Sequence, residues 1–311
     1  MNLAPYVQIV ARGKGRARAM AFEEAREAMS LILSGHAAPE AVGALLMVMR
    51  LRGETAAEIA GFTAALRAHM REKLPHADLD WPSYAAGRSR GAPLFLLAAQ
   101  LVGRAGYRVS MHGWNSHQSA AASVRDAIDF VGPNVSYSPL EVLSPAAFKV
   151  LKLRDKFGLR SCFNTVLRMW NPSGAPASVQ GVFHPSYRSL QAQAAELLGQ
   201  KHLSIIKGGG GEFERNPAKD AVVFGLRDGL HFQETAQHLL EDTRKLHEAG
   251  NPINLPDLWG GRAHDTFAIA AITGTATLAL WTLKAAPTIF DAQDMARALW
   301  DRRHDTESLS L

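Results

Sequence analysis

A turn bounded by glycines, Gly87 to Gly91, holds two arginines at a position where a phosphate could bind. It joins a short predicted strand ending at Gly87 to a predicted apolar helix over 94–102. Free backbone amides and the positive end of the helix dipole favour an anion there, and Arg88 and Arg90 add positive charge. Because glycines are also common in purely structural turns, a phosphate site and a plain turn stay equally open. Gly87 and Gly91 are the candidate phosphate-binding glycines.

Polar side chains also follow the next predicted strand, over 107–111. His112, Asn115, Ser116 and Ser119 come soon after it, and ligands of open α/β sheets bind outside the carboxyl ends of strands. These four residues are therefore candidate substrate-binding groups. For His112, the alternative of a histidine hydrogen-bonded within a turn is slightly preferred.

Four consecutive glycines, 208–211, follow a third predicted strand. Their backbone allows a ligand to approach closely, so Gly208 and Gly209 are candidate phosphate-binding residues. Glu212 and Glu214 come next and could hold Mg²⁺ through carboxylate oxygens. Alternating glutamates also describe a plain surface strand, which is the preferred interpretation, and we predict no metal site.

The composition is that of an ordinary globular protein. Hydrophobic residues make up 47% and charged residues 20% of the 311 residues, which excludes wholesale disorder. The single cysteine, Cys162, excludes an intrachain disulfide and a cysteine-based zinc site, and fits a reducing, cytoplasmic location. No signal-peptide pattern or Ser-His-Asp arrangement stands out. The longest uncharged apolar run, 267–283, is shorter than the ~20 residues that span a bilayer, which predicts a buried helix and no membrane partner.

Basic residues are concentrated in three segments, 1–20, 81–125 and 142–195, although the net charge is only +5. Together these segments carry 16 basic side chains and 1 acidic one, whereas the rest of the chain has 18 basic and 28 acidic. Such segregation can create a surface that attracts polyanions, unless the three segments face different directions. The candidate nucleic-acid-binding residues are Arg12, Lys14, Arg16, Arg18, Arg88, Arg90, Lys149, Lys152, Lys156, Arg160 and Arg168.

The elements that must position these residues fall into two kinds. Helical patterns fill the first seventy residues, with a capping box at Thr55 and Glu58. From about residue 79 the pattern becomes strand–helix–strand, which implies parallel pairing. Further strands are predicted over 179–183, 203–206 and 222–225, and further helices within 145–170, over 265–284 and over 291–303. The predicted fold is a small helical domain plus a larger α/β domain with a mostly parallel sheet.

Two blocks of this sequence resemble a known family. Residues 23–67, with Leu45 to Arg50 and Arg52 to Thr55 as clear matches, are similar to the helical domain of anthranilate phosphoribosyltransferase and its relatives, the family-3 glycosyltransferases. Residues 153–172, from Leu153-Arg154 to Asn171-Pro172, are similar to the family's Val-Arg-x-x-Leu-Gly-x-Arg-Thr-x-Phe-Asn segment.

The resemblance implies a division into two domains and a dimer. The helical dimerisation domain would comprise residues 1–75 plus about 145–172, and the α/β domain residues 76–144 plus 173–311. The fold would also be similar to that of the class II nucleoside phosphorylases. Two chains would pair through their helical parts. Arg154 matches the family's anthranilate-contacting arginine.

Several positions depart from the family's donor site. Ala86 to Gly91 stands where the family has Gly-Thr-Gly-Gly-Asp, and Pro93 to Phe95 where it has Asn-x-Ser-Thr. Met111 replaces a lysine, and Phe213-Glu214 stands for the Mg²⁺-binding Asp-Glu pair. Since losing one oxyanion donor costs ~10²–10³ in rate, we do not expect phosphoribosyl transfer to anthranilate.

Two further elements, Arg12 to Arg18 and His184 to Tyr187, resemble the family's non-catalytic, nucleic-acid-binding branch. The predicted function is therefore sequence-independent binding of nucleic acid through a basic surface near the domain junction, without a cofactor. The alternative is an active glycosyl- or phosphoribosyltransferase with an altered donor or acceptor. In that case Arg88, Arg90 and the glycines 208–211 would hold phosphates, and Glu212 or Glu214 would bind Mg²⁺. An anion-binding subunit for a protein partner also stays open.

Overall fold

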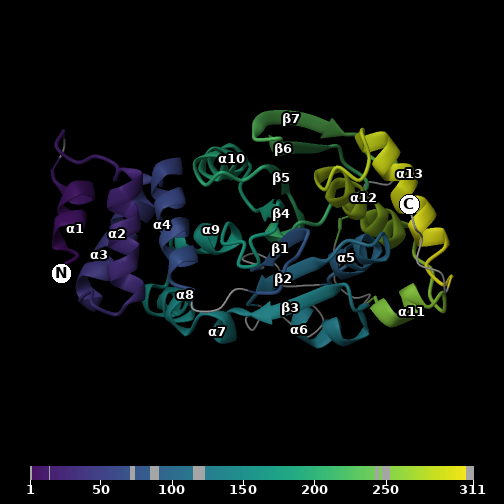
Figure 1. Cartoon of the computed structure of the whole chain (residues 1–311), viewed down its shortest axis with the longest axis horizontal. Helices are drawn as coiled ribbons and strands as arrows, with labels where there is room; N and C mark the ends of the chain where they lie inside the picture. The colour runs from purple at the N-terminus through teal and green to yellow at the C-terminus, as the bar shows by residue number, and fades with distance from the viewer. Residues whose placement is uncertain are drawn as a thin grey trace.

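The computed structural model describes residues 2–13, 15–70, 74–84, 91–114, 123–241, 245–246 and 253–305. Helices of the N-terminal part lie at one end of an elongated molecule, and the sheet with its helices lies at the other (Figure 1). Between them, α9 (Phe163–Arg168) lies next to α4 (Ala56–Ala68) on one side and to the sheet on the other (Figure 1).

In the described part of the chain, six helices form the helical end of the molecule. The capping box predicted at the start of α4 is confirmed, since the Thr55 hydroxyl accepts from the Glu58 amide and the Glu58 carboxylate accepts from the Thr55 amide at 2.9 Å. Gly61 lets α4 approach α2, because a Cβ there would lie 2.3 Å from the Phe22 carbonyl oxygen. The six helices are α1 (Ala4–Ala11), α2 (Phe22–Leu33), α3 (Pro39–Arg52), α4 (Ala56–Ala68), α8 (Pro145–Phe157) and α9 (Phe163–Arg168).

The sheet has seven strands in the order β3-β2-β1-β4-β5-β6-β7. The first five pair in parallel and the last two form an antiparallel hairpin, so the predicted mostly parallel sheet is confirmed. Parallel neighbours direct their carboxyl ends to the same edge of the sheet. The strands are β1 (Leu79–Ser83), β2 (Val109–Gly113), β3 (Val135–Pro139), β4 (Ala177–Val182), β5 (His202–Lys207), β6 (Ala221–Arg227) and β7 (Leu230–Ala236).

Helices cover both faces of the sheet. In β5, Leu203 and Ile205 join the core that contains α10 and the helical end, whereas Ile206 joins the core of α5, α12 and α13. This alternation follows from the two-residue repeat of a strand. The helices of this part are α5 (Phe95–Arg104), α6 (Val124–Ala127), α7 (Leu140–Leu143), α10 (Tyr187–Leu197), α11 (Leu255–Trp259), α12 (Thr266–Thr282) and α13 (Ile289–Asp301).

The apolar run over 267–283 forms α12, which is buried along most of its length, as predicted. Among the residues that the structure describes, no helix is long and apolar enough to cross a membrane. Both β3 and β7 were absent from the sequence prediction. The short strand expected to end at Gly87 ends at Ser83 instead.

Candidate functional site

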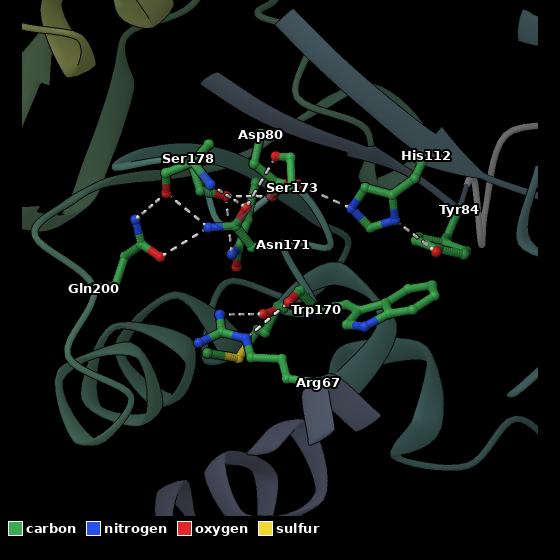
Figure 2. Close-up of polar contacts among 12 residues, drawn as sticks. Arg67, Asp80, Tyr84, His112, Trp170, Asn171, Ser173, Ser178 and Gln200 are labelled. Atoms are coloured by element: carbon green, nitrogen blue, oxygen red, sulfur yellow. Dashed lines mark hydrogen bonds and ion pairs between the residues drawn. The ribbon is translucent and has the colours of Figure 1, made fainter. Parts of the chain in front are cut away.

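A buried polar network lies on β1 and β2 (Figure 2). His112 Nε2 lies 3.1 Å from Asp80 Oδ1, and His112 Nδ1 lies 2.8 Å from the Tyr84 hydroxyl. Ser178 on β4 donates a hydrogen bond of 2.9 Å to the second carboxylate oxygen of Asp80. The side chains of Asp80 and His112 are 0% exposed, so the network is sealed within the protein.

The predicted substrate residue His112 thus contacts protein groups. It lies within β2 and not in a turn, and its role in binding a substrate stays a prediction. Its ring packs edge-on against Trp170 and Tyr84 at centroid distances of 5.8 and 5.4 Å. Burial raises the pKa of Tyr84 well above its usual range, which keeps the hydroxyl protonated. The network therefore fixes the ends of β1 and β2, and sequence reasoning missed Asp80 and Tyr84 as its members.

A second set of contacts ties the helical end to the α/β part (Figure 2). Arg67 on α4 donates from Nε to the Trp170 carbonyl at 2.8 Å and from Nη2 to the Met169 carbonyl at 2.9 Å. Asn171, at a positive φ of 49°, donates its side-chain amide to the Ala175 carbonyl. These bonds hold the segment after α9 between the two parts of the molecule.

Four arginines gather near this segment, and we call them the junction arginines: Arg50, Arg154, Arg160 and Arg168. Burial and the positive charges of Arg154 and Arg50 lower the pKa of Arg160. In the part of the chain that the structure describes, Arg50 and Arg160 make no ion pair, and Arg154 reaches only Asp155, at 4.0 Å. Like charges gathered with so little compensation favour a bound anion.

Arg168 is the most deeply buried of the four, at 6% exposed. Burial lowers the pKa of its guanidinium, Glu212 opposes that change, and Arg160 reinforces it. A Cβ on Gly211 would lie 3.4 Å from Arg168 Nη2, so the guanidinium lies against the glycine-rich turn. Within the described residues Nη2 has no hydrogen-bond partner, and neither does the buried Nη1 of Arg154. Unpaired buried donors are costly unless a ligand satisfies them.

Trp114, at the end of β2, connects α8 to this region. It is 7% exposed and packs edge-on against Phe148 at 5.7 Å between centroids. The charged ends of Lys152 and Arg154 lie 5.3 and 5.7 Å from its ring centre. Attraction between cations and the ring therefore helps to hold these two side chains in place.

Tyr187, from the His184 to Tyr187 element, donates a 3.0 Å hydrogen bond to the carboxylate of Glu54. Burial and the neighbouring Glu54 raise the pKa of Tyr187 to about 12. Since Tyr187 begins α10 and Glu54 precedes α4, this bond joins the two parts of the molecule.

The carboxylates of the glycine-rich turn do not form the surface strand expected for them. Glu212 and Glu214 are 1% and 0% exposed and lie outside any strand. The reason is that the turn folds back on itself, so that a Cβ on Gly208 would lie 1.7 Å from the Glu212 carbonyl oxygen.

Towards a magnesium ion this turn offers the carboxylates of Glu212 and Glu214. Phe213, between the two glutamates, packs edge-on against Trp81 in the core at 5.5 Å and offers no oxygen. The positive charge of Arg168 acts on Glu212. The residues that the structure describes contain no group of three His, Cys, Asp or Glu side chains able to hold a metal, but Mg²⁺ also binds through one or two carboxylates together with substrate phosphates and water.

The N-terminal basic segment lies elsewhere. With α1 it forms the outer end of the helical part, away from the sheet (Figure 1), so the expectation that it lines the domain junction is wrong. Arg12 and Arg16 are exposed there. Arg18 forms two hydrogen bonds of 2.6 Å with Glu24 and is compensated locally.

The remaining predicted residues divide between α8, the start of α5 and the undescribed segments. Lys149, Lys152 and Lys156 are exposed on α8, where Lys152 pairs with Asp155. Gly91 lies just before α5 with a φ of 82°. The predicted residues that fall outside the described part of the chain are Lys14, Gly87, Arg88, Arg90, Asn115, Ser116 and Ser119.

The sequence is similar to that of a known family of transferases. Residues 5–70 match the helical bundle domain of the glycosyl transferase family. The anthranilate phosphoribosyltransferase of Sinorhizobium medicae is 30% identical, over 73% of this chain and 71% of that protein. The one from Symbiobacterium thermophilum is 31% identical, over 71% and 69%. The chain spans less of other relatives: 62% of the Mesorhizobium japonicum protein, at 31% identity, and 57% of a Desulfitobacterium hafniense protein, at 32%.

Solved structures share the fold. Anthranilate phosphoribosyltransferase from Thermus thermophilus superposes with a TM-score of 0.74 at 21% identity, covering 96% of this chain and 94% of that one. The Saccharomyces cerevisiae enzyme in complex with PRPP and Mg gives a TM-score of 0.71 at 16% identity, covering 97% and 95%. At these identities the likeness concerns the fold alone.

Proposed function

This chain belongs to the family-3 glycosyltransferases related to anthranilate phosphoribosyltransferase, and on that premise we propose that it is a glycosyl- or phosphoribosyltransferase with an altered donor or acceptor. Its ligand is a ribose phosphate held at the junction between the helical end and the α/β part. The relatives named above, two of which it matches over about 70% of both chains, support transferase chemistry on this scaffold.

One observation supports the location of the site: the junction arginines lie near one another, and guanidinium nitrogens of Arg154 and Arg168 have no hydrogen-bond partner within the described residues. An ionised phosphate would accept hydrogen bonds from these donors, and charge-assisted bonds of this kind are about twice as strong as neutral ones. It would also relieve the mutual repulsion of Arg154, Arg160 and Arg50.

The arginines suit the charge that develops in glycosyl transfer. The bond between the sugar carbon and the phosphate oxygen breaks while the acceptor binds to that carbon, and negative charge builds on the departing phosphate. Fixed cations in a partly buried site stabilise that charge. In the proposal the arginines perform this role without a metal.

The direct test is turnover. Phosphoribosyl pyrophosphate is incubated with the protein and a panel of aromatic amine and heterocyclic base acceptors, and pyrophosphate release is followed with and without EDTA. We expect release with an acceptor other than anthranilate, and its loss in the variant R154Q/R160Q. No release with any acceptor, together with no binding of the donor, would refute the proposal.

A second candidate function is sequence-independent binding of nucleic acid. It is favoured by the exposed lysines Lys149, Lys152 and Lys156 on α8, the helix that also carries Arg154. Each phosphate contact should add about −0.9 to the slope of log K against log salt on duplex DNA. The segment that follows α1 lies at the outer end of the helical part (Figure 1), so this surface comprises α8 and its surroundings.

The variant K149Q/K152Q/K156Q separates the two candidates. If nucleic acid is the ligand, the variant lowers affinity for a duplex oligonucleotide uniformly across sequences and flattens the salt slope. If a small ribose phosphate is the ligand, R154Q/R160Q alone reduces binding, and the lysine variant leaves it unchanged.

A further inference from the structure

A pocket of about 310 Å³ lies where β5 ends and β6 begins. Lys207, the last residue of β5, and the next two glycines, Gly208 and Gly209, line one part of it. Arg188, Arg215 and Lys219 line other parts. Its described lining includes none of the junction arginines, so it is a separate feature of the molecule.

Arg215 is the unusual residue of this pocket because it is charged and only 1% exposed. Its Nη2 donates to the carbonyl oxygens of Ala236 and Gln237, and its backbone amide donates to the Thr275 hydroxyl at 2.9 Å. Among the residues that the structure describes, Nε and Nη1 have no hydrogen-bond partner. No carboxylate forms an ion pair with Arg215 in that part of the chain. A guanidinium held in this way keeps a positive charge at the wall of the pocket, which no carboxylate among the described residues pairs with directly.

The other charged groups of the pocket leave it positive. Lys207 and Lys219 are exposed, and Arg188 is held by the Pro185 and Val222 carbonyls, with its guanidinium 4.5 Å from the centre of the Phe224 ring. These contacts do not neutralise any of the cations.

The acid of the pocket is Asp220, whose side chain accepts a hydrogen bond from the His238 amide at 2.7 Å and lies 2.9 Å from His238 Nδ1. Hydrogen bonds from His238 are the largest cause that lowers the pKa of Asp220, and the positive charge of Arg215 lowers it further. Among its described lining residues, the pocket thus combines four cationic side chains with one acid that already has a hydrogen-bond partner.

We propose that this pocket is a binding site for a small phosphate dianion, either inorganic phosphate or a phosphate monoester. The ligand would accept hydrogen bonds from the amino groups of Lys207 and Lys219 and would lie beside the buried positive charge of Arg215, which lines the pocket. Gly208 allows the backbone to fold close beside it, because a side chain there would collide with the Glu212 carbonyl. The pocket is independent of the proposed transferase activity, and either can be wrong without the other.

The test is isothermal calorimetry of inorganic phosphate at low ionic strength with the whole chain. Lys207→Gln and Lys219→Gln together remove two exposed charges and should leave the fold intact. We expect them to weaken phosphate binding about tenfold or more, as loss of charge-assisted hydrogen bonds predicts. The matched control, K201Q/K284Q, removes two lysines outside the pocket and should bind phosphate like the wild type. R215M should abolish binding if it folds, as circular dichroism will show.

Phosphomonoesters distinguish the two forms of the ligand. Ribose 5-phosphate that competes with inorganic phosphate at the same site indicates a monoester site, whereas failure to compete indicates inorganic phosphate alone. The proposal is overturned if the wild type does not bind phosphate, or if K207Q/K219Q binds it unchanged. It is equally overturned if R154Q/R160Q removes the binding, because the phosphate then occupies the domain junction.

Discussion

Two buried polar regions of this protein differ in whether their charges find partners within the chain. In the network on β1 and β2, Asp80 lies beside His112 and accepts a bond from Ser178. At the junction, Arg154 and Arg168 keep guanidinium nitrogens without a hydrogen-bond partner among the described residues. A paired buried group stabilises the fold, whereas an unpaired one costs stability that a ligand can restore. Asp80 Oδ1 and His112 Nε2 make no hydrogen bond in the described part of the chain either, but they lie 3.1 Å from each other. The contrast therefore supports a structural role for the first region and is the basis for proposing a ligand site at the second.

The largest expected effect comes from breaking the paired region. Asp80→Ala should lower the free energy of unfolding by about 3–5 kcal/mol, because it leaves His112 and Ser178 buried without their partner. The measurement is urea denaturation. As a control, Asp78→Ala removes a partly exposed carboxylate that pairs with Arg108 and should cost about 1 kcal/mol or less. Equal effects of the two substitutions would contradict a structural role for the network.

A smaller effect is expected where the two parts of the molecule meet. Tyr187→Phe removes the hydrogen bond to Glu54 and should destabilise the protein by about 1–2 kcal/mol, the range for a bond to a charged group. Tyr107→Phe is the control, because that hydroxyl makes no hydrogen bond within the described residues. Thermal unfolding of the two variants should differ, and a Tyr187→Phe variant as stable as Tyr107→Phe would show that the bond does not tie the two parts together.

The exposed Arg18–Glu24 pair at the outer end of the helical part should contribute less to stability, and its contribution should depend on pH. Hydrogen bonding to Arg18 lowers the pKa of Glu24 to about 2 from an ordinary 4.5. A depressed carboxyl pKa adds stability above the unfolded value, and this stability is lost as the pH falls from about 4.5 towards 2. For an exposed pair the contribution is at most about 1 kcal/mol. Unfolding measured across this range should show a shallower pH dependence in Glu24→Gln than in wild type. Identical slopes would exclude the pair as a contributor.

The smallest expected effect concerns Arg160, one of the junction arginines. Arg160→Gln removes one of the like charges around Arg154 and Arg50, so the unfolding free energy of the protein without ligand should stay unchanged or rise by about 0.5 kcal/mol. Urea denaturation at low salt measures it. A marked loss of stability would mean that Arg160 makes structural contacts and is not held for a ligand.

Local patterns in the sequence predicted much of the fold. The Thr55–Glu58 capping box, the uncharged helix α12 and the central strands β4 to β6 all depend on neighbouring residues, and they are confirmed. The strand β3 was not predicted because its residues are mostly polar and only Val135 is buried. The strand β7 was not predicted because it is an exposed strand at the edge of the sheet.

The candidate site was less predictable because it depends on residues far apart in the chain. Asp80 and Ser178 are separated by 98 positions, and no local spacing joins them. The same holds for Arg168 and Gly211, which meet only once α9 and the glycine-rich turn are packed together. Charge counting did find Arg160 and Arg168, but it could not show that Arg12 and Arg16 lie at the opposite end of the helical part.

The most direct test of the junction site is calorimetric titration of phosphoribosyl pyrophosphate, in EDTA, into the wild type and into R154Q/R160Q. If the arginines replace the metal in holding phosphate, the wild type binds without magnesium and the double variant binds at least about tenfold more weakly. Binding that requires magnesium, or that is the same in both proteins, would contradict the site described for the domain junction.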